Sequence, residues 1–320
     1  MKRIALSVGD PAGIGPEIAI RAAVAPSVRQ QLQPILVGPG TLLEDTARGL
    51  GIVPSTLLIE DVDCPDLASV KPGQLSAAAG LAAYLAIERA VQLCRSHRAD
   101  AICTAPIHKG ALRLAGIHDV GHTELLSRLL DGPEGLTLFI TASLRIFFFS
   151  RHLSLRQAID ALNVEDLAAF AERAHRALTQ LGFERPSLAL AALNPHAGDG
   201  GQFGDEETRI LAPAVSLAQS RGVRLSGPWP ADSVFHQAAE GSFDAVLSLY
   251  HDQGHIAAKT RDFHGTVSAT LGLPVLRTSV DHGTAMDIAG RGIAEPRSMI
   301  AALLAAAELL ERRAAVKIES

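Results

Sequence analysis

Short apolar segments alternate with longer helical patterns along almost the whole chain, and this alternation constrains the fold more than any other feature. The apolar segments are hydrophobic throughout, which is typical of strands buried on both faces of a sheet. The pattern therefore predicts an α/β fold with a largely parallel sheet. The expected strands are Arg3–Val8, Pro34–Val37, Ala99–Thr104, Leu136–Thr141, Leu144–Ser150, Leu188–Ala192, Ala245–Tyr250 and Val275–Val280. The expected helices are Ala77–Arg95, Val164–Leu181, Glu206–Ser220 and Arg297–Ala314.

Composition narrows the class of protein. A chain of 320 residues can bury one large core or two medium ones. Its net charge of -5 gives no general attraction to nucleic acid or anionic lipid. The 3 cysteines have no paired spacing, and the segment from Met1 to Gly9 lacks the longer apolar core of a signal peptide. We expect a cytoplasmic protein that binds neither nucleic acid nor a membrane.

Three histidines, His152, His196 and His251, each follow an expected strand. Ligands of open α/β sheets bind outside the carboxyl ends of the strands, so polar residues repeated at that position form a pattern. Three imidazoles that leave a coordination position open suit a catalytic divalent ion. Any one of the chain's 12 histidines is, however, more often a surface or core residue, and the long spacings match no compact metal motif.

Other candidates are anion-binding groups. His122 and Thr123 open an expected helix, whose N-terminus favours a carboxylate or phosphate, although a simple helix cap explains the pair equally well. Lys259 and Arg277 bracket a segment with strand-like alternation and have the two side-chain types that usually bind phosphate. Either could instead be a solvated surface charge. The Gly-rich Gly9–Glu17 segment has neither the P-loop ending nor the spacing of GxGxxG.

A second Gly-rich segment follows the last expected strand. The run from Asp281 to Gly292 (DHGTAMDIAGRG) resembles the adenosine-binding loop of isopropylmalate and isocitrate dehydrogenases. The resemblance implies binding of NAD, with NADP as the alternative. Glu295 departs from it, because that family usually has Asn before the proline. The implied cofactor-binding residues are His282, Gly283, Thr284, Ala285 and Asp287.

Together these segments resemble the 4-hydroxythreonine-4-phosphate dehydrogenase family over nearly the whole chain. Its most specific parts are Asn194–Gly201, Tyr250–Gly254 and Leu271–Gly283. The resemblance implies two α/β/α domains with a central cleft, as in isocitrate and isopropylmalate dehydrogenases, and a homodimer with active sites at the subunit interface. We expect one domain from residues 1–124 plus 280–320. The other, 125–279, would carry the metal ligands and the dimer interface.

The resemblance also implies roles for the candidates. His152, His196 and His251 would bind one divalent ion (zinc, magnesium, cobalt or manganese) shared across the interface. The substrate would lie against His122, Thr123, Lys259 and Arg277. These roles agree with those drawn from the residues themselves.

One substrate position departs from the biosynthetic enzymes, which have Asn where this chain has Ser268. That change favours a paralogous branch that acts on 4-phospho-D-threonate or 4-phospho-D-erythronate. The expected reaction is NAD- and metal-dependent oxidation of the C3 hydroxyl, followed by decarboxylation to dihydroxyacetone phosphate and CO2. The alternative substrate is 4-phosphohydroxy-L-threonine, used in pyridoxal phosphate biosynthesis.

The general base is not identified by the sequence. Asp232 and Asp252 are candidates, and both have a structural interpretation as turn residues. Two further hypotheses concern other classes of protein. A three-histidine metallohydrolase would need no NAD and would leave the 281–292 segment unexplained. A metal- or phosphate-sensing protein on the same fold would show no turnover.

Overall fold

The computed structural model describes residues 1–119, 121–133 and 135–319, with side chains as far as residue 314. The chain divides into two compact units. Unit 1 comprises residues 1–135 and 267–311, and unit 2 comprises 136–266 and 312–320. Residues 125–135 and 267–279, which the sequence analysis assigns to the second domain, therefore lie in unit 1. Residues 267–279 lie in unit 1 because strand 267–271 pairs with strand 277–280, which itself pairs with strand 101–104.

Unit 1 is a layered α/β structure. Its strands lie in the order β3-β2-β1-β4-β11-β10, and the described pairs are parallel except β10–β11. The strands are β1 (Lys2–Ser7), β2 (Leu32–Gly38), β3 (Ile59–Asp61), β4 (Ala101–Thr104), β10 (Val267–Leu271) and β11 (Arg277–Val280). The helices are α1 (Gly15–Val24), α2 (Pro26–Arg29), α3 (Gly40–Gly49), α4 (Ala77–Arg95), α5 (Lys109–Leu114), α6 (His122–Leu129) and the start of α12 (Arg297–Glu319), with short 3-10 turns at Pro54–Thr56 and Leu67–Ser69.

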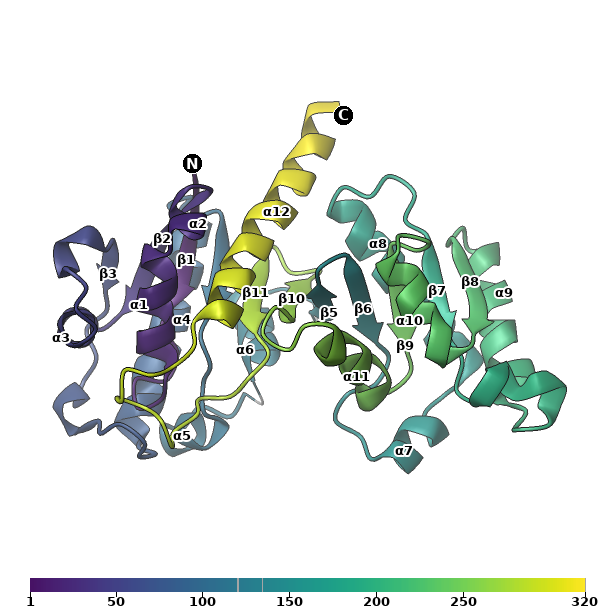
Figure 1. Cartoon of the computed structure of the whole chain (residues 1–320), viewed down its shortest axis with the longest axis horizontal. Helices are drawn as coiled ribbons and strands as arrows, with labels where there is room; N and C mark the ends of the chain where they lie inside the picture. The colour runs from purple at the N-terminus through teal and green to yellow at the C-terminus, as the bar shows by residue number, and fades with distance from the viewer. Residues whose placement is uncertain (120, 134, 320) are drawn as a thin grey trace. The chain divides into compact units, whose positions relative to one another are not determined.

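Helices cover both faces of this sheet (Figure 1). On one face, Ile87 of α4 and Leu125 of α6 pack in one cluster with Ala5 and Ile102 of the strands. On the other face, Thr278 donates to the Ala302 carbonyl of α12 at 2.8 Å. By length and apolar composition α4 alone among the described helices could span a membrane, but 56% of its apolar window is buried. We conclude that α4 is a core helix.

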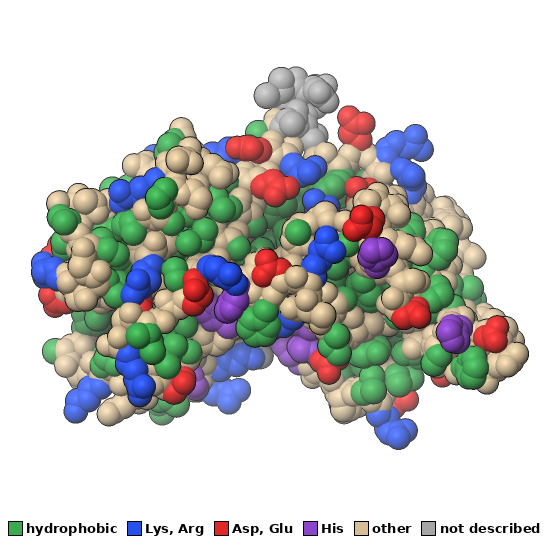
Figure 2. Space-filling view, viewed as in Figure 1, with side chains coloured by type: hydrophobic (Ala, Val, Ile, Leu, Met, Phe, Trp, Pro, Cys, Tyr) green, Lys and Arg blue, Asp and Glu red, His purple; other side chains and the backbone are tan. Residues whose placement is uncertain are grey.

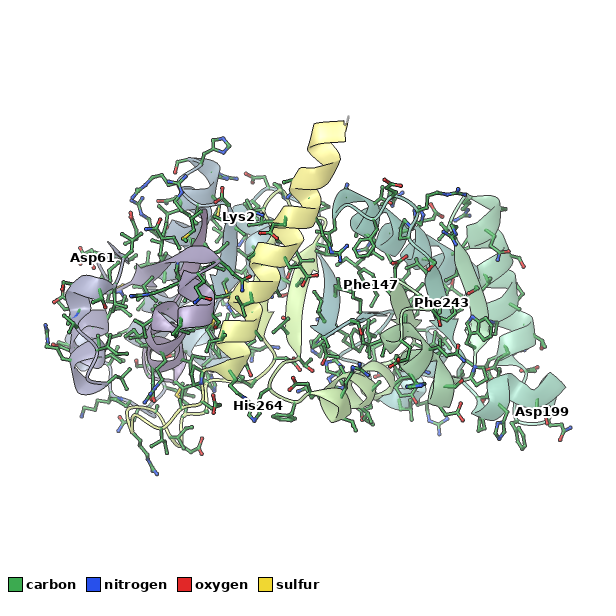
Figure 3. All side chains as sticks on the ribbon, turned by 45° about the horizontal axis from the view of Figure 1, so that its top comes forward. Lys2, Asp61, Phe147, Asp199, Phe243 and His264 are labelled. Carbon is green, nitrogen blue, oxygen red and sulfur yellow. The ribbon has the colours of Figure 1, made fainter. Side chains whose placement is uncertain are left out.

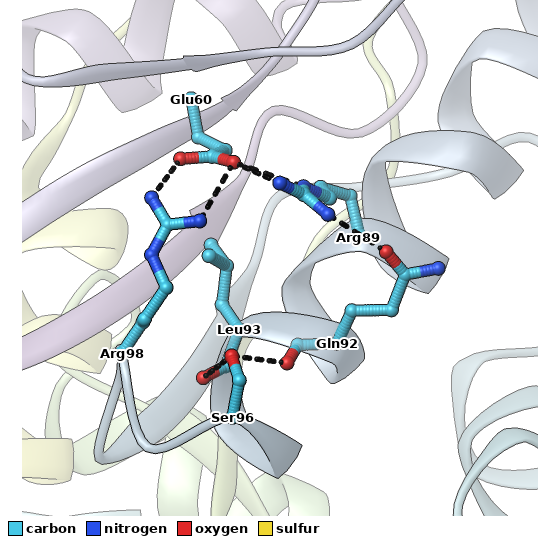
Figure 4. A network of polar contacts seen from close by, with 6 residues as sticks. All are labelled: Glu60, Arg89, Gln92, Leu93, Ser96 and Arg98. Atoms are coloured by element: carbon cyan, nitrogen blue, oxygen red, sulfur yellow. Dashed lines mark hydrogen bonds and ion pairs between the residues drawn. The ribbon is translucent and has the colours of Figure 1, made fainter.

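The edge strand β3 is tied to α4 by one carboxylate (Figure 4). Glu60 accepts hydrogen bonds from Arg89 at 2.9 Å and from Arg98 at 2.7 Å. Burial raises the pKa of Glu60, but the hydrogen bonds from both arginines outweigh it, so the pKa lies below its usual value. An ionised, doubly paired carboxylate thus fixes a strand of only 3 residues.

Unit 2 is a second α/β layer structure. Its strands lie in the order β5-β6-β9-β7-β8, and all described pairs are parallel except β5–β6. The strands are β5 (Leu136–Thr141), β6 (Leu144–Phe148), β7 (Leu188–Ala191), β8 (Leu225–Trp229) and β9 (Ala245–Ser248). The helices are α7 (Leu155–Asp160), α8 (Val164–Gln180), α9 (Ala212–Ser220), α10 (Ala231–Ala239) and α11 (His251–Arg261), with a helical turn at Pro195–Gly201 and a π-turn at Glu207–Leu211.

The core of unit 2 lies around the strands. Val234 and Phe235 of α10 and Ala258 of α11 pack against Ile146 and Val246 of the sheet. Phe147 is fully buried and lies among the strands, whereas Asp199 is exposed and lies in the helical turn Pro195–Gly201 (Figure 3). Charged side chains of both signs are interspersed over the face seen in Figure 2. The predicted α/β fold with a largely parallel sheet is confirmed.

Candidate active site

A row of hydroxyl side chains crosses four neighbouring strands of unit 1. Ser7 of β1 is in register with Thr104 of β4, Thr104 with Ser279 of β11, and Ser279 with Ser268 of β10. All four residues are buried. Side chains in register on adjacent strands point to the same face, so the sheet carries a polar strip close to the carboxyl ends of its parallel strands.

Arg277 lies beside this row, two positions before Ser279 on β11, and is itself buried. Its Nε and Nη2 both donate to Thr104 Oγ1, at 3.1 and 2.7 Å, and its Nη1 donates to Thr270 Oγ1 at 3.2 Å. A guanidinium is charged at every physiological pH. The sequence-predicted phosphate ligand is therefore a buried, oriented cation rather than a solvated surface charge.

His122 shares the environment of Arg277. It is the first residue of α6, and its Nε2 is buried without a hydrogen-bond partner among the described residues. Burial lowers the pKa of His122 well below its ordinary value, the nearby Arg277 charge lowers it further, and a hydrogen bond with the Ala105 backbone opposes both. His122 is therefore neutral at physiological pH, so its Nε2 is available as a hydrogen-bond acceptor.

Thr123 and Ser268 complete the substrate candidates of unit 1. A Cβ placed on Gly135 would lie 2.5 Å from a methyl carbon of Thr270 and 3.2 Å from that of Thr123, so the two threonines lie close together. The Ser268 hydroxyl donates weakly to the Ser279 carbonyl at 3.4 Å. Four of the five predicted substrate residues thus belong to unit 1: His122, Thr123, Ser268 and Arg277.

The Gly-rich turn after β1 brings a carboxylate to the same edge of the sheet. Asp10 is fully buried; one oxygen accepts from the Ala12 amide at 2.9 Å, and the other has no partner among the described residues. Burial raises the pKa of Asp10, while the Ala12 hydrogen bond and the nearby His108 lower it. Asp10 does not stand out in the sequence, because the surrounding glycines dominate that motif.

The 281–292 loop is attached to this turn. The Ile14 amide donates to the Thr284 carbonyl at 2.9 Å, and a Cβ on Gly13 would lie 2.8 Å from the Thr284 side chain. Only glycine permits that approach. Thr284 is buried as a result, whereas Gly283 and Asp287 are exposed and His282 and Ala285 are partly exposed.

A carboxylate of α1 holds the far end of the same loop. Glu17 Oε1 accepts from the Ala294 amide at 2.8 Å and from Arg21 at 3.2 Å, and Arg21 also donates to the Gly292 carbonyl at 2.7 Å. The loop borders a cavity of about 380 Å³ lined in part by Gly13, Glu17, Leu42, Gly290 and Gly292. A loop anchored at both ends beside a cavity is suitable for clasping part of a dinucleotide.

In unit 2, the three metal candidates follow three neighbouring strands. His152 comes after β6, His251 after β9 and His196 after β7, and these strands are parallel and adjacent in the order β6-β9-β7. The carboxyl ends of parallel strands meet at one edge of a sheet, so all three histidines belong to the same edge. His152 and His196 are exposed and His251 is partly exposed.

The backbone around His196 is held in an unusual conformation. Five successive residues from His196 to Gly200 have positive φ, including 53° at His196 and 43° at Asp199. The buried Glu207 anchors this turn: its Oε1 accepts from the amides of Leu193 and Asn194, and its Oε2 from the Asn194 side chain. Three of these five residues are not glycine, and non-glycine residues held in the left-handed region cluster at functional sites.

His251 begins α11 and is fixed by its neighbours. Its Nδ1 lies 2.6 Å from Asp252 Oδ1, and its ring stacks on that of His255 at 3.8 Å. Asp252 is 71% exposed, and Asp232, in the first turn of α10, is also exposed. Lys259, farther along α11, has its Nζ 5.4 Å from the centre of the Phe263 ring.

Among the described residues of this single chain, no group of three histidine, cysteine or acidic side chains is close enough to hold a metal ion. The donor type still suits a divalent ion, because three imidazoles come to one edge of unit 2. The assignment of His152, His196 and His251 as metal ligands therefore stays a prediction. The same is true of the substrate, cofactor and general-base residues.

Besides Asp10, two residues beside Arg277 in unit 1 could not be recognised from the sequence. Thr104 and Thr270 bind Arg277, yet Thr104 is separated from Arg277 by 173 positions. The available signal was the concentration of hydroxyl residues at the ends of β4, β10 and β11, which acquires meaning only once the strand order is known.

A family profile and two similar proteins were found by comparison with known sequences. A family profile described as "Pyridoxal phosphate biosynthetic protein PdxA" matches residues 28–306. A protein of Symbiobacterium thermophilum named "Putative D-threonate 4-phosphate dehydrogenase" is 47% identical, covering 92% of this chain and 93% of its own. A protein of the same name from Halalkalibacterium halodurans is 45% identical, with the same coverages.

Solved structures agree with this result. A 4-hydroxythreonine-4-phosphate dehydrogenase from Klebsiella pneumoniae has a TM-score of 0.87 and 39% identity, covering 97% of this chain and 99% of its own. One from Burkholderia phymatum has a TM-score of 0.83 at 39% identity, covering 97% and 98%. A β-decarboxylating dehydrogenase from Thermococcus kodakarensis shares the fold alone, with a TM-score of 0.50, 19% identity and coverages of 99% and 87%.

Proposed function

This chain belongs to the PdxA family of pyridoxal phosphate biosynthetic proteins, and on that premise we propose that it oxidises 4-phospho-D-threonate or 4-phospho-D-erythronate with NAD. It is an oxidoreductase, a dehydrogenase that acts on a 4-phosphorylated hydroxy acid. The oxidised substrate then loses CO2 and gives dihydroxyacetone phosphate. The observation that carries the proposal is the buried Arg277 guanidinium, oriented by two threonine hydroxyls next to the neutral His122.

The proposed reaction has two steps. Hydride leaves the third carbon of the substrate for the nicotinamide ring, and the hydroxyl proton is transferred to a base. The resulting β-keto acid breaks the bond to its carboxylate, and the second carbon of the enol then takes up a proton. Asp232 and Asp252 remain the candidates for the base, and both are exposed in the single chain.

Three candidate residues of unit 1, Arg277, His122 and Ser268, have distinct roles in this proposal. Arg277, together with Lys259, binds the phosphate, so binding energy far from the reacting carbon orients the substrate. His122 accepts a hydrogen bond from a substrate hydroxyl through Nε2, which suits a neutral imidazole. Ser268 lies in the hydroxyl row and faces the second carbon, where the two candidate substrate types differ.

His152, His196 and His251 would hold a divalent ion. When bound, such an ion supplies Lewis-acid stabilisation of negative charge on the substrate oxygen. The attachment of the 281–292 loop to Gly13 and Glu17 supports binding of the adenosine part of NAD. We further propose a homodimer in which two subunits complete each metal site, and a cytoplasmic location.

The second candidate function is oxidation of 4-phosphohydroxy-L-threonine. It is favoured by the names of the two solved structures, whereas the other substrate type is favoured by the names of the two relatives at higher identity. The two relatives and the three solved structures named above are dehydrogenases, so they give no support to the metallohydrolase and sensor hypotheses.

The test is turnover on the three substrates side by side. NADH formation is measured at saturating NAD and divalent metal with 4-phospho-D-threonate, 4-phospho-D-erythronate and 4-phosphohydroxy-L-threonine. We expect the highest kcat/KM with one of the two hydroxy acids, and dihydroxyacetone phosphate as the product. A strong preference for the amino acid substrate would establish the second candidate instead.

A further inference from the structure

The Thr104 hydroxyl makes every hydrogen bond that a hydroxyl group can make. Its oxygen accepts from Nε and from Nη2 of Arg277 at 3.1 and 2.7 Å, which uses both lone pairs. Its own proton is donated to Ser279 Oγ at 3.0 Å. Thr104 is fully buried, so water cannot replace any of these partners.

The neighbouring hydroxyls fix the direction of this bond set. Ser279 Oγ donates to the Thr104 carbonyl at 2.9 Å, so it is committed as an acceptor toward the Thr104 hydroxyl. Thr270, paired with Arg277 in the β10–β11 ladder, accepts from Nη1 at 3.2 Å. Two buried threonines thus hold three of the five N–H groups of the guanidinium.

The geometry of these three bonds orients the guanidinium plane. Thr104 occupies the edge formed by Nε and Nη2, and Thr270 occupies one N–H of Nη1. A phosphate bound through two of its oxygens needs a guanidinium plane in a fixed orientation, which these three bonds provide.

We propose that Thr104 is a positioning residue for phosphate recognition, because its hydroxyl pre-orients Arg277 before the substrate binds. This inference rests on the proposed function, in which Arg277 binds the substrate phosphate. A group held in its bound orientation loses less conformational freedom on binding, so affinity increases without a new contact to the ligand. Thr104 acts through Arg277 and does not itself touch the substrate.

Thr104→Val tests the inference, because valine keeps the branched shape and removes only the hydroxyl. We expect KM for the phosphorylated substrate to rise about tenfold, and competitive inhibition by inorganic phosphate to weaken by a similar factor, with kcat changed less than about threefold. NADH affinity should stay the same. Thr104→Ser keeps the hydroxyl and should restore most of the phosphate affinity.

Thr278→Val is the matched control. Thr278 is also fully buried and neighbours Arg277 on β11, but its hydroxyl donates to α12 on the opposite face of the sheet. It should lose stability without a change in KM or phosphate inhibition. Equal KM values in Thr104→Val and Thr278→Val, or failure of Thr104→Ser to restore phosphate affinity, would overturn the inference.

Two further outcomes are informative. If Thr104→Val does not fold, Thr270→Val removes the other hydroxyl and should raise KM in the same direction by a smaller factor. An unchanged KM in Thr270→Val would then contradict the inference. A wild type that oxidises no 4-phosphorylated acid overturns the proposed function and the inference together, and it is recognised before any variant is compared.

Discussion

His122 stays neutral at pH values where an exposed histidine gains a proton, because burial and the Arg277 charge both disfavour its cationic form. The unfolded chain has no such restriction and takes up the proton near the ordinary pKa of about 6.5. Between the depressed folded pKa and the ordinary one, the unfolded state therefore binds more protons, so stability rises with pH in that interval.

We predict that the wild type loses stability as the pH falls below about 6.5, by at most about 1.4 kcal/mol per pH unit from this residue. His122→Gln removes the titrating group and should show a smaller loss over the same range. The measurement is the free energy of unfolding by urea from pH 5 to pH 8. The exposed His118→Gln serves as the control and should follow the wild type. Parallel curves for all three proteins would contradict the prediction.

Ser268 is the residue at which the two substrate types should separate. Asparagine reaches farther than serine and offers two amide donors and a carbonyl acceptor. A site built for one polar group discriminates against an analogue that leaves buried partners unpaired. Ser268→Asn should therefore reduce the preference for the hydroxy acid over 4-phosphohydroxy-L-threonine by about tenfold, seen in the ratio of kcat/KM values. A ratio equal to that of the wild type would show that Ser268 does not face the second carbon.

Candidate residues could be selected from the sequence where they stand in a recognisable motif, but not where strand pairing alone brings their partners together. His122 and Arg277 stand in recognisable contexts, so the sequence pointed to both. Thr104 has no motif, and its importance depends on the placement of β4 beside β11, which is 173 positions away along the chain. Neither hydropathy nor spacing contains that information.

Helices and strands followed the sequence pattern where they are long or uniformly apolar. The expected helix Ala77–Arg95 coincides with α4, because the Ser76 side chain caps its start by accepting from the Ala79 amide. The strand β3 was not expected, since it has only 3 residues and depends on the Glu60 ion pairs. The strand β8 contains Gly227-Pro228, a pair that normally indicates a turn.

Substitution by alanine at two helical glycines of unit 1 should change stability in opposite directions. A Cβ on Gly80 of α4 would lie 2.0 Å from the Ala111 carbonyl oxygen of α5, so Gly80→Ala must push the two helices apart. We expect a loss of about 1–3 kcal/mol. A Cβ on Gly49, the last residue of α3, meets nothing within 4 Å.

Gly49→Ala should therefore raise the free energy of unfolding by about 0.5–1 kcal/mol, because alanine loses less backbone entropy in a helix. Urea unfolding of the two variants beside the wild type is the measurement. Equal stabilities for Gly80→Ala and Gly49→Ala would contradict the close packing of α4 on α5.

At the scale of the whole molecule, the predicted metal ligands all belong to unit 2, and four of the five substrate candidates belong to unit 1. The proposed dimer gives a direct test of how these sets combine. If each active site takes His196 and Arg277 from different subunits, a mixed dimer of one variant at each position contains one intact site.

We therefore predict that His196→Ala and Arg277→Met, each inactive alone, regain about a quarter of wild-type activity after they are unfolded together and refolded. Half of the random dimers are mixed, and each of these has one intact site of two. The control is each variant carried through the same procedure alone. An absence of recovered activity in a solution shown by light scattering to contain dimers would contradict a site shared in this way.

The division of the chain also has a consequence for its biosynthesis. Residues 136–266 form an uninterrupted segment of unit 2, whereas unit 1 needs β10 and β11, which the ribosome makes after that segment. Until β11 emerges, β4 is an edge strand with unpaired backbone groups, and Arg277 has not yet been translated. The sheet of unit 1 therefore stays incomplete while more than a hundred further residues are translated. Unit 2 can thus fold first, and the hydroxyl row of unit 1 is among the last features of the protein to form.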